Sequence, residues 1–250
     1  MDTIEKQYPV MPLKNTVLFP QQVIPIYVGR KKSLKLIEDL DPDNKYLVVV
    51  AQQDGSVEDP KEQDLYSYGT LALVLKTFDM PDNSKSAIVQ GVDRVKILKY
   101  EEGDDYFIAD VERIPESITT PDVQVEALAK SLKNSFTELI KISPNLNEEH
   151  AGMLSNIDRP SRLADRATSL LSVSNSEKQE VLEELDIKKR VEIAINLLQK
   201  EIQRIKLGEE IQTEVQDEIS KTQREYYLRE QMKTIQKELG EDNQTVELDE

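Results

Sequence analysis

Two hydrophobic patterns divide the chain near residue 115. Before this point, short apolar runs rich in Val, Ile, Leu and Tyr are separated by turn residues, a spacing that predicts strands rather than helices. One helix is expected over Lys31–Leu40, ended by the turn sequence DPDN. The expected strands cover residues 8–13, 23–28, 46–51, 69–78, 86–100 and 106–114.

The predicted strands differ in how deeply they should be buried. Tyr46–Ala51 is a continuous apolar run, which is typical of a central strand covered on both faces. Gly69 and Gly91 supply bends at positions where a small sheet would have to curl. Six strands with one helix therefore predict a small curled sheet or partly closed barrel, about residues 1–115.

After residue 115 the period becomes helical. PESITTPD predicts a linker over residues 116–122, and helices are expected at 123–142, at 148–155, from Pro160, and at 176–185. Five apolar residues then recur at intervals of four and three, a pattern that packs helices together. These residues are Val191, Ile195, Leu198, Ile202 and Ile205. The pattern predicts a helical bundle over residues 123–207, with Gly208 as a break or kink before the next helix.

A long helix is expected over residues 208–240, followed by a polar tail at 241–250. At about 100° per residue its apolar residues form two sets, turned by roughly a third of a revolution from one another. We expect the compact part of the chain to cover the first set and something outside this chain to cover the second. The first set is Ile211, Val215, Ile219 and Tyr226; the second is Leu228, Met232, Ile235 and Leu239.

Composition then narrows the function classes. A net charge of −16 disfavours a nucleic-acid or anionic-lipid surface, because both need clustered cations. The chain has no cysteine, which excludes disulfides, Cys-ligated metal and cysteine nucleophiles. No apolar run reaches the length of a membrane span, and MDTIEKQY has no signal-peptide character, so we expect a cytoplasmic protein.

Catalytic motifs are absent from the sequence. No two of the eight glycines are closer than Gly91 and Gly103, which excludes a glycine-rich phosphate loop. His150 is the single histidine, and a surface or helix-end position suits it better than a serine triad or a zinc site. Adjacent carboxylate pairs such as Glu183 and Glu184 are read as solvated rather than catalytic. We therefore expect no catalytic residue, no metal and no cofactor in this chain.

The order of several segments resembles one protein family along almost the whole chain. QREYYLREQMKTIQKELGE (Gln223–Glu241) is similar to the end of the amino-terminal region of bacterial Lon, the ATP-dependent protease. Pro9–Leu34, Tyr68–Ile97, RPSRLADRATSLLS and KQEVLEELDIKKRVEIAINLLQKEI resemble the preceding parts of that region. The resemblance implies an α+β fold: a PUA-like curled sheet or pseudo-barrel with one helix, then a helical bundle and a long C-terminal helix.

The resemblance also implies a role. This region of the family engages unfolded or tagged proteins for a hexameric ATP-dependent serine protease, whose Walker motifs and Ser–Lys dyad are not in this sequence. ATP and Mg²⁺ would thus belong to the parent enzyme. An apolar and basic segment is the expected substrate contact, although its apolar residues suit ordinary core equally well and its cations suit an ordinary helix start. It consists of Ile24, Ile26, Tyr27, Val28, Arg30, Lys31 and Lys32. The expected contacts with a partner helix or neighbouring subunit are Tyr227, Leu228, Met232, Ile235 and Leu239.

Two other classes stay open on the sequence. A free-standing adaptor with the same fold would carry the same residues without an ATPase. An RNA-binding PUA module is disfavoured by the acidic charge, and a stand-alone enzyme by the missing nucleophile and metal motifs.

Overall fold

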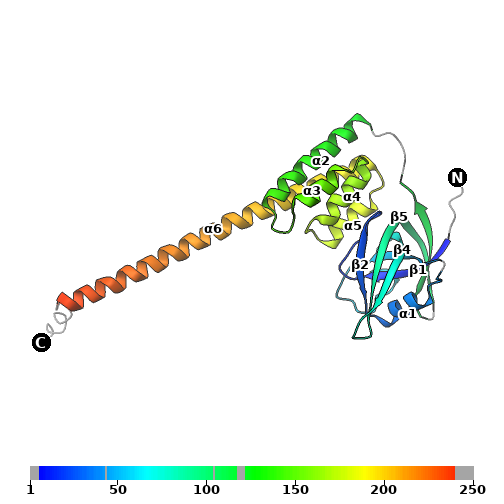
Figure 1. Ribbon diagram of the computed structural model, residues 1–250, viewed down its shortest axis with the longest axis horizontal. Helices are drawn as coiled ribbons and strands as arrows, with labels where there is room; N and C mark the ends of the chain where they lie inside the picture. Colours follow the sequence, from blue (N-terminus) through cyan, green and yellow to red (C-terminus); the bar gives the residue numbers. More distant parts are fainter. Residues whose placement is uncertain (1–5, 43, 104, 117–121, 240–250) are drawn as a thin grey trace. The chain divides into compact units, whose positions relative to one another are not determined.

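The computed structural model describes residues 6–42, 44–103, 105–116 and 122–239. Its first half is a six-stranded sheet with one α-helix and a short 3₁₀ turn, and its second half is helical (Figure 1). Each strand agrees with the sequence-based expectation to within two residues at either end. The elements of the first half are β1 (Lys6–Leu13), β2 (Val23–Val28), α1 (Lys31–Asp39), β3 (Tyr46–Ala51), η1 (Glu62–Asp64), β4 (Tyr68–Asp79), β5 (Lys85–Glu102) and β6 (Phe107–Ile114).

The sheet closes into a barrel because β5 is long enough to pair with β2 along its first part and with β6 along its last part. The strand order is β2-β5-β4-β3-β1-β6, and a further β5–β6 pairing joins the ends. The first part of β5 pairs with β2, while residues 94–102 pair with β6. β1 and β3 are parallel, and the other pairings are antiparallel. The expected curled sheet is therefore confirmed, and it is a ring of β5, β4, β3, β1 and β6.

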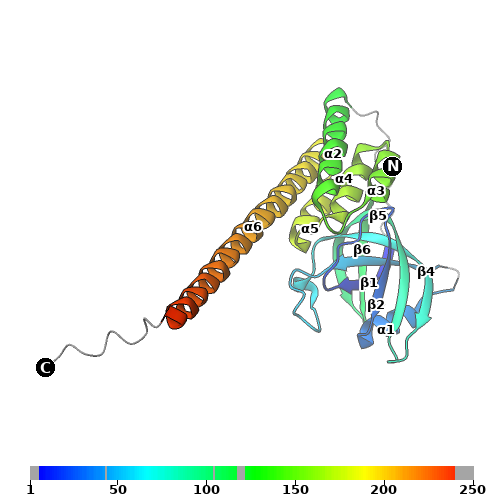
Figure 2. The ribbon, with the colours of Figure 1, turned by 60° about the vertical axis from the view of Figure 1, so that its left-hand side comes forward.

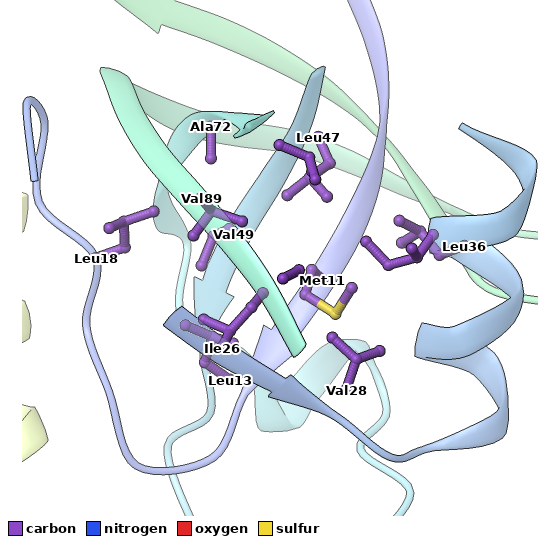
Figure 3. Packing of buried hydrophobic residues seen from close by; sticks show 13 residues of the cluster. Met11, Leu13, Leu18, Ile26, Val28, Leu36, Leu47, Val49, Ala72 and Val89 are labelled. Carbon is purple, nitrogen blue, oxygen red and sulfur yellow. The ribbon is translucent and has the colours of Figure 1, made fainter. Parts of the chain in front are cut away.

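Strand β3 separates two hydrophobic clusters, which explains its uninterrupted apolar sequence. Leu47 and Val49 point into one cluster with Leu36 of α1 and Ile26 of β2 (Figure 3). Val48 and Val50 point into the other cluster, together with residues of β5 and β6. Because both faces are buried, alternation with polar residues is lost.

Gly91 marks the place where the loop before β2 crosses β5. A Cβ there would lie 2.3 Å from the Phe19 carbonyl oxygen, so no larger residue fits without backbone movement. The Gly91 amide donates to Gln22 O at 2.9 Å, and its carbonyl accepts from Gln21 at 2.9 Å. The β4–β5 register shifts beside it, where Val92 is the extra residue on β5.

The second half consists of α2 (Val123–Ile142), α3 (Glu148–Ser155), α4 (Pro160–Leu170), α5 (Asn175–Glu183) and α6 (Ile187–Leu239). Asp122 caps α2 by accepting from the Gln124 amide, as its residue type favours. Ser174 and Glu177 form a capping box at α5. The helices pack through stripes of buried residues, such as Leu132 and Phe136 on α2.

Buried polar residues join the barrel to the helices. Arg94 of β5 forms an ion pair with Asp165 of α4, and its Nε donates to Leu182 O at 3.0 Å. Gln179 of α5 donates to Tyr68 O of β4 at 3.0 Å. Arg190 of α6 is also buried; burial, with the nearby positive charge of Arg94, lowers its pKa to about 10, so it stays protonated at neutral pH.

Helix α6 runs without interruption from Ile187 to Leu239 (Figure 2). The expected break at Gly208 is therefore wrong: Gly208 is an interior helical residue with open space around its Cα. Tertiary contacts divide the chain into units of residues 1–202 and 203–250. Up to Ile202 the helix buries a stripe that includes Val191 and Leu198.

The boundaries predicted at residues 115 and 122 stay predictions. Five linker residues, 117–121, and the tail 241–250 lie outside the described residues. Among the helices that the structure does describe, none is long and apolar enough to cross a membrane.

Candidate functional site

Strand β2 alternates between the core and the surface, which divides the predicted substrate contacts. Ile26 and Val28 are buried, at 5% and 1% exposure, and Ile24 packs partly buried against the same cluster. Tyr27 points the other way and is 68% exposed. The prediction is thus corrected for Ile26 and Val28, which stabilise the core and leave no surface for a partner, because successive strand residues face opposite sides.

Apolar residues from three strands lie on the same face as Tyr27, and the one from β5, Ile88, is half-buried. In the strand register Tyr27 and Phe78 both pair with Ser86, while Pro25 pairs with Ile88. Val23 is 51% and Phe78 41% exposed. We call Val23, Pro25, Tyr27, Phe78 and Ile88 the outer apolar face.

A bulge in β4 creates this face. Val74 pairs with Val89 and points into the core, but the next pair joins Lys76 to Ile88, so Leu75 is an extra residue. The extra residue reverses the alternation, and Phe78 consequently faces outward instead of inward. Sequence reasoning missed Phe78 because its position depends on this bulge; the one available signal was an aromatic residue beside the turn sequence MPDNSK.

Polar contacts hold the two aromatic residues of the face. The Tyr27 hydroxyl donates to the Asp82 carboxylate at 3.0 Å, which ties β2 to the β4–β5 turn. Hydrogen bonds from Ser84, and then from Tyr27, lower the pKa of Asp82. Lys76 Nζ lies 4.7 Å from the ring centroid of Phe78, a cation–π contact. The face is therefore apolar but fixed in position.

The three predicted basic residues line a separate cavity of about 340 Å³ beside the start of α1, which we call the α1 pocket. Arg30 donates to Gln52 Oε1 and to Val57 O, so it holds the loop that follows β3. Burial lowers its pKa, against the opposing effect of Glu58 and Asp59. The other lining residues are Val10, Pro12, Lys31, Lys32, Ser33, Pro60, Tyr106 and Phe107.

The distal residues of α6 form the third candidate surface. Tyr227, Leu228 and Met232 are 62%, 53% and 61% exposed, and Ile235 and Leu239 are exposed to a similar degree. The first apolar set of this helix is exposed as well, with Ile211 at 52%. The expectation that the compact part of the chain covers the first set is therefore wrong.

The single histidine lies at the start of α3. His150 belongs to the capping box of α3, where its Nδ1 lies 2.7 Å from Asn147 Oδ1, so the helix-end interpretation holds. Within the described ranges, no three His, Asp or Glu side chains are grouped to hold a metal ion.

Comparisons with known proteins agree on one family. Residues 7–200 match the family described as "ATP-dependent protease La (LON) substrate-binding domain". The chain is 42% identical to "Lon protease" of Koribacter versatilis over 97% of its own length and 30% of that protein. It is 39% identical to "Lon protease" of Dictyoglomus thermophilum over 95% of the chain and again 30% of the relative. The chain thus spans about a third of the length of these curated relatives.

Solved structures show the same fold. The N-terminal domain of a Mycobacterium avium complex Lon protease covers 78% of this chain and 98% of its own, with a TM-score of 0.63 and 22% identity. The Lon N-terminal domain protein of Xanthomonas campestris covers 75% of this chain and 95% of its own, with a TM-score of 0.55 and 18% identity.

Proposed function

The chain belongs to the family of Lon substrate-binding domains, and we propose that it recognises unfolded, damaged or tagged proteins for a longer ATP-dependent serine protease. The observation that carries this proposal is the outer apolar face, which exposes aromatic and aliphatic side chains on a rigid sheet. Unfolded polypeptides display apolar side chains that folded proteins bury. A fixed apolar surface without a deep polar pocket suits such substrates.

In this proposal the chain binds and the rest of the enzyme performs the chemistry. Nucleotide and Mg²⁺ would be held by the ATPase part and peptide bonds would be cleaved by the Ser–Lys part, both outside this sequence. The chain itself acts without cofactor. We assign the protein to the cytoplasm, where such substrates arise.

Assembly is the second part of the proposal. The exposed apolar residues of α6 would pair with a neighbouring subunit of a hexamer, since an isolated helix that exposes Leu228, Met232 and Ile235 gains by burying them.

Substrate capture is tested with Tyr27→Ser/Phe78→Ser. The double variant should bind fluorescently labelled, reduced and carboxymethylated α-lactalbumin about tenfold more weakly than the unaltered chain, because burying one aromatic side chain contributes roughly 1.5 kcal/mol or more. Fluorescence anisotropy measures the affinity. Arg30 is left intact because its bonds to Gln52 and Val57 make it structural.

The matched control is Leu98→Ser/Val123→Ser, which removes two exposed apolar side chains, at 45% and 79% exposure, outside the outer apolar face. Its affinity should stay within about twofold of the unaltered chain, and both variants should keep the melting temperature. Equal affinities for the two double variants would remove the outer apolar face from the binding site.

A further inference from the structure

The α1 pocket has the walls of a binding site for one side chain. Val10 and Phe107 are buried barrel residues, and Pro60 is buried in the loop after β3. These side chains are fixed by the core, so the cavity is formed before any partner arrives. Its volume of about 340 Å³ lies at the small end of ligand sites, which run from about 300 to 1,000 Å³.

The charges around the pocket are incompletely balanced. Glu58 is held by Lys14 at 2.5 Å, and Asp59 by Lys32 at 3.0 Å. Each of the two carboxylates on the wall is therefore already paired with a lysine.

The remaining two cations of the pocket have different surroundings. Arg30 donates to two neutral acceptors, Gln52 Oε1 and Val57 O. Lys31 is exposed, and no ion pair holds it in the part of the chain that the structure describes. Glu58 and Asp59 also act on Arg30, so the apolar cavity opens beside one cation, Lys31, that no ion pair holds in the described residues, in a protein whose net charge is −16. That combination is complementary to an apolar group that carries a carboxylate.

We infer that the α1 pocket binds the C-terminal residue of a substrate polypeptide, with its apolar side chain in the cavity and its α-carboxylate beside Lys31. This inference rests on the proposed function and names the substrate feature that the basic residues would read. A C-terminal residue carries its side chain and its carboxylate on one Cα atom, so a single residue reaches both the cavity and the cation. An internal acidic residue carries its carboxylate and a neighbouring apolar side chain on different Cα atoms.

Three fluorescein-labelled peptides of one neutral sequence test the inference on the chain of residues 1–250. The first ends in leucine with a free carboxylate, the second in leucine amide, and the third in serine with a free carboxylate. The free leucine peptide should bind at least about tenfold more tightly than either of the others, as one charge-assisted contact or one buried aliphatic side chain supplies about 1.4 kcal/mol or more. Fluorescence anisotropy measures each affinity.

Lys31→Glu should abolish the preference for the free carboxylate while the melting temperature is kept. The matched control is Lys130→Glu, at an exposed lysine of α2, which changes the net charge equally and should keep the preference. Equal binding of the free leucine peptide and its amide would overturn the inference, without requiring any variant to fold. A preference that survives Lys31→Glu would equally overturn it.

A parallel titration with carboxymethylated α-lactalbumin separates the two proposals. If that unfolded protein is captured through the outer apolar face while the peptides bind alike, the proposed function stands and the pocket inference fails. If the unfolded protein is not captured, the proposed function fails.

Discussion

At the scale of single residues, Glu116 fastens the end of the barrel to α4. Its carboxylate accepts from Arg159 at 2.9 Å and from Arg162 Nε at 2.8 Å, and also from the Ser161 hydroxyl. Burial opposes ionisation of Glu116, but the bonds from Ser161, Arg162 and Arg159 outweigh it and lower its pKa. Glu116, predicted as part of a linker, is thus an anchored residue.

The lowered pKa of Glu116 makes its contribution depend on pH. A depressed carboxyl pKa stabilises the folded state above the unfolded-state pKa of glutamate, and this stabilisation is lost as pH falls through the folded-state pKa. We expect Glu116→Gln to lower the free energy of unfolding by about 1–2 kcal/mol at pH 7. The deficit should shrink in acid, as urea denaturation at several pH values would show.

Glu180→Gln is the control for this effect, since Glu180 is an exposed residue of α5. It should change the stability little at either pH. A Glu116→Gln deficit that persists unchanged in acid would show that the charge of Glu116 is not its source.

Residue types were easier to predict than residue environments. The sequence places Tyr27 and Val28 next to each other in a strand, and alternation alone puts them on opposite faces. The outward position of Phe78 required the bulge at Leu75, which follows from pairing with a distant strand. Arg30 could be predicted as a cation near the surface, but its bonds to Gln52 depend on a loop that no local pattern specifies.

At the scale of elements, the most instructive feature is the continuity of α6. The flanking residues of Gly208 include strong helix formers such as Lys206, Leu207 and Glu209. A single glycine inside a helix costs only about 1 kcal/mol relative to alanine, so the surrounding helix outweighs it. The expected break failed because glycine ends a helix where it adopts the left-handed conformation itself, and Gly208 keeps a helical one.

Gly208→Ala should strengthen α6. No atom lies within 4 Å of a Cβ built at Gly208, so the substitution removes backbone freedom without a clash. Amides around residue 208 should exchange more slowly with solvent by about fivefold, equivalent to about 1 kcal/mol. Hydrogen exchange with mass spectrometry measures this protection, and faster exchange in the alanine variant would contradict the expectation.

At the scale of the whole molecule, the two hydrophobic periods predicted the α+β division and the helical bundle. The pairings that close the ring could not be predicted, because β1 must pair with both β3 and β6, which are distant from it in sequence. Local periodicity reports which face of an element is buried, but not what buries it. The exposed residues of α6 show the same limit.

Association of whole chains is tested with Met232→Asp/Ile235→Asp. Both side chains are exposed, at 61% and 54%, so the stability of residues 1–202 should be unchanged within about 0.5 kcal/mol. The mass in solution at high concentration should fall toward that of one chain, because charge opposes apolar helix pairing. Sedimentation velocity over a range of concentrations measures the mass.

Gln212→Asp/Gln216→Asp serves as the control, since both are exposed polar residues of α6 that precede Tyr227 by about three turns or more. This control should associate as the unaltered chain does. Unfolding of the globular part by the Met232 and Ile235 changes would instead place both residues in its core.

The hydrogen-bonded ring of the barrel has a consequence for the proposed capture of unfolded polypeptides. Within the described strands, β2 alone pairs on one side only, and its proline at position 25 offers no amide hydrogen to an incoming strand. This edge can therefore present apolar side chains while offering fewer backbone donors to an incoming strand. In the proposed function, unfolded substrates would bind here through their side chains and leave without adding a strand to this edge.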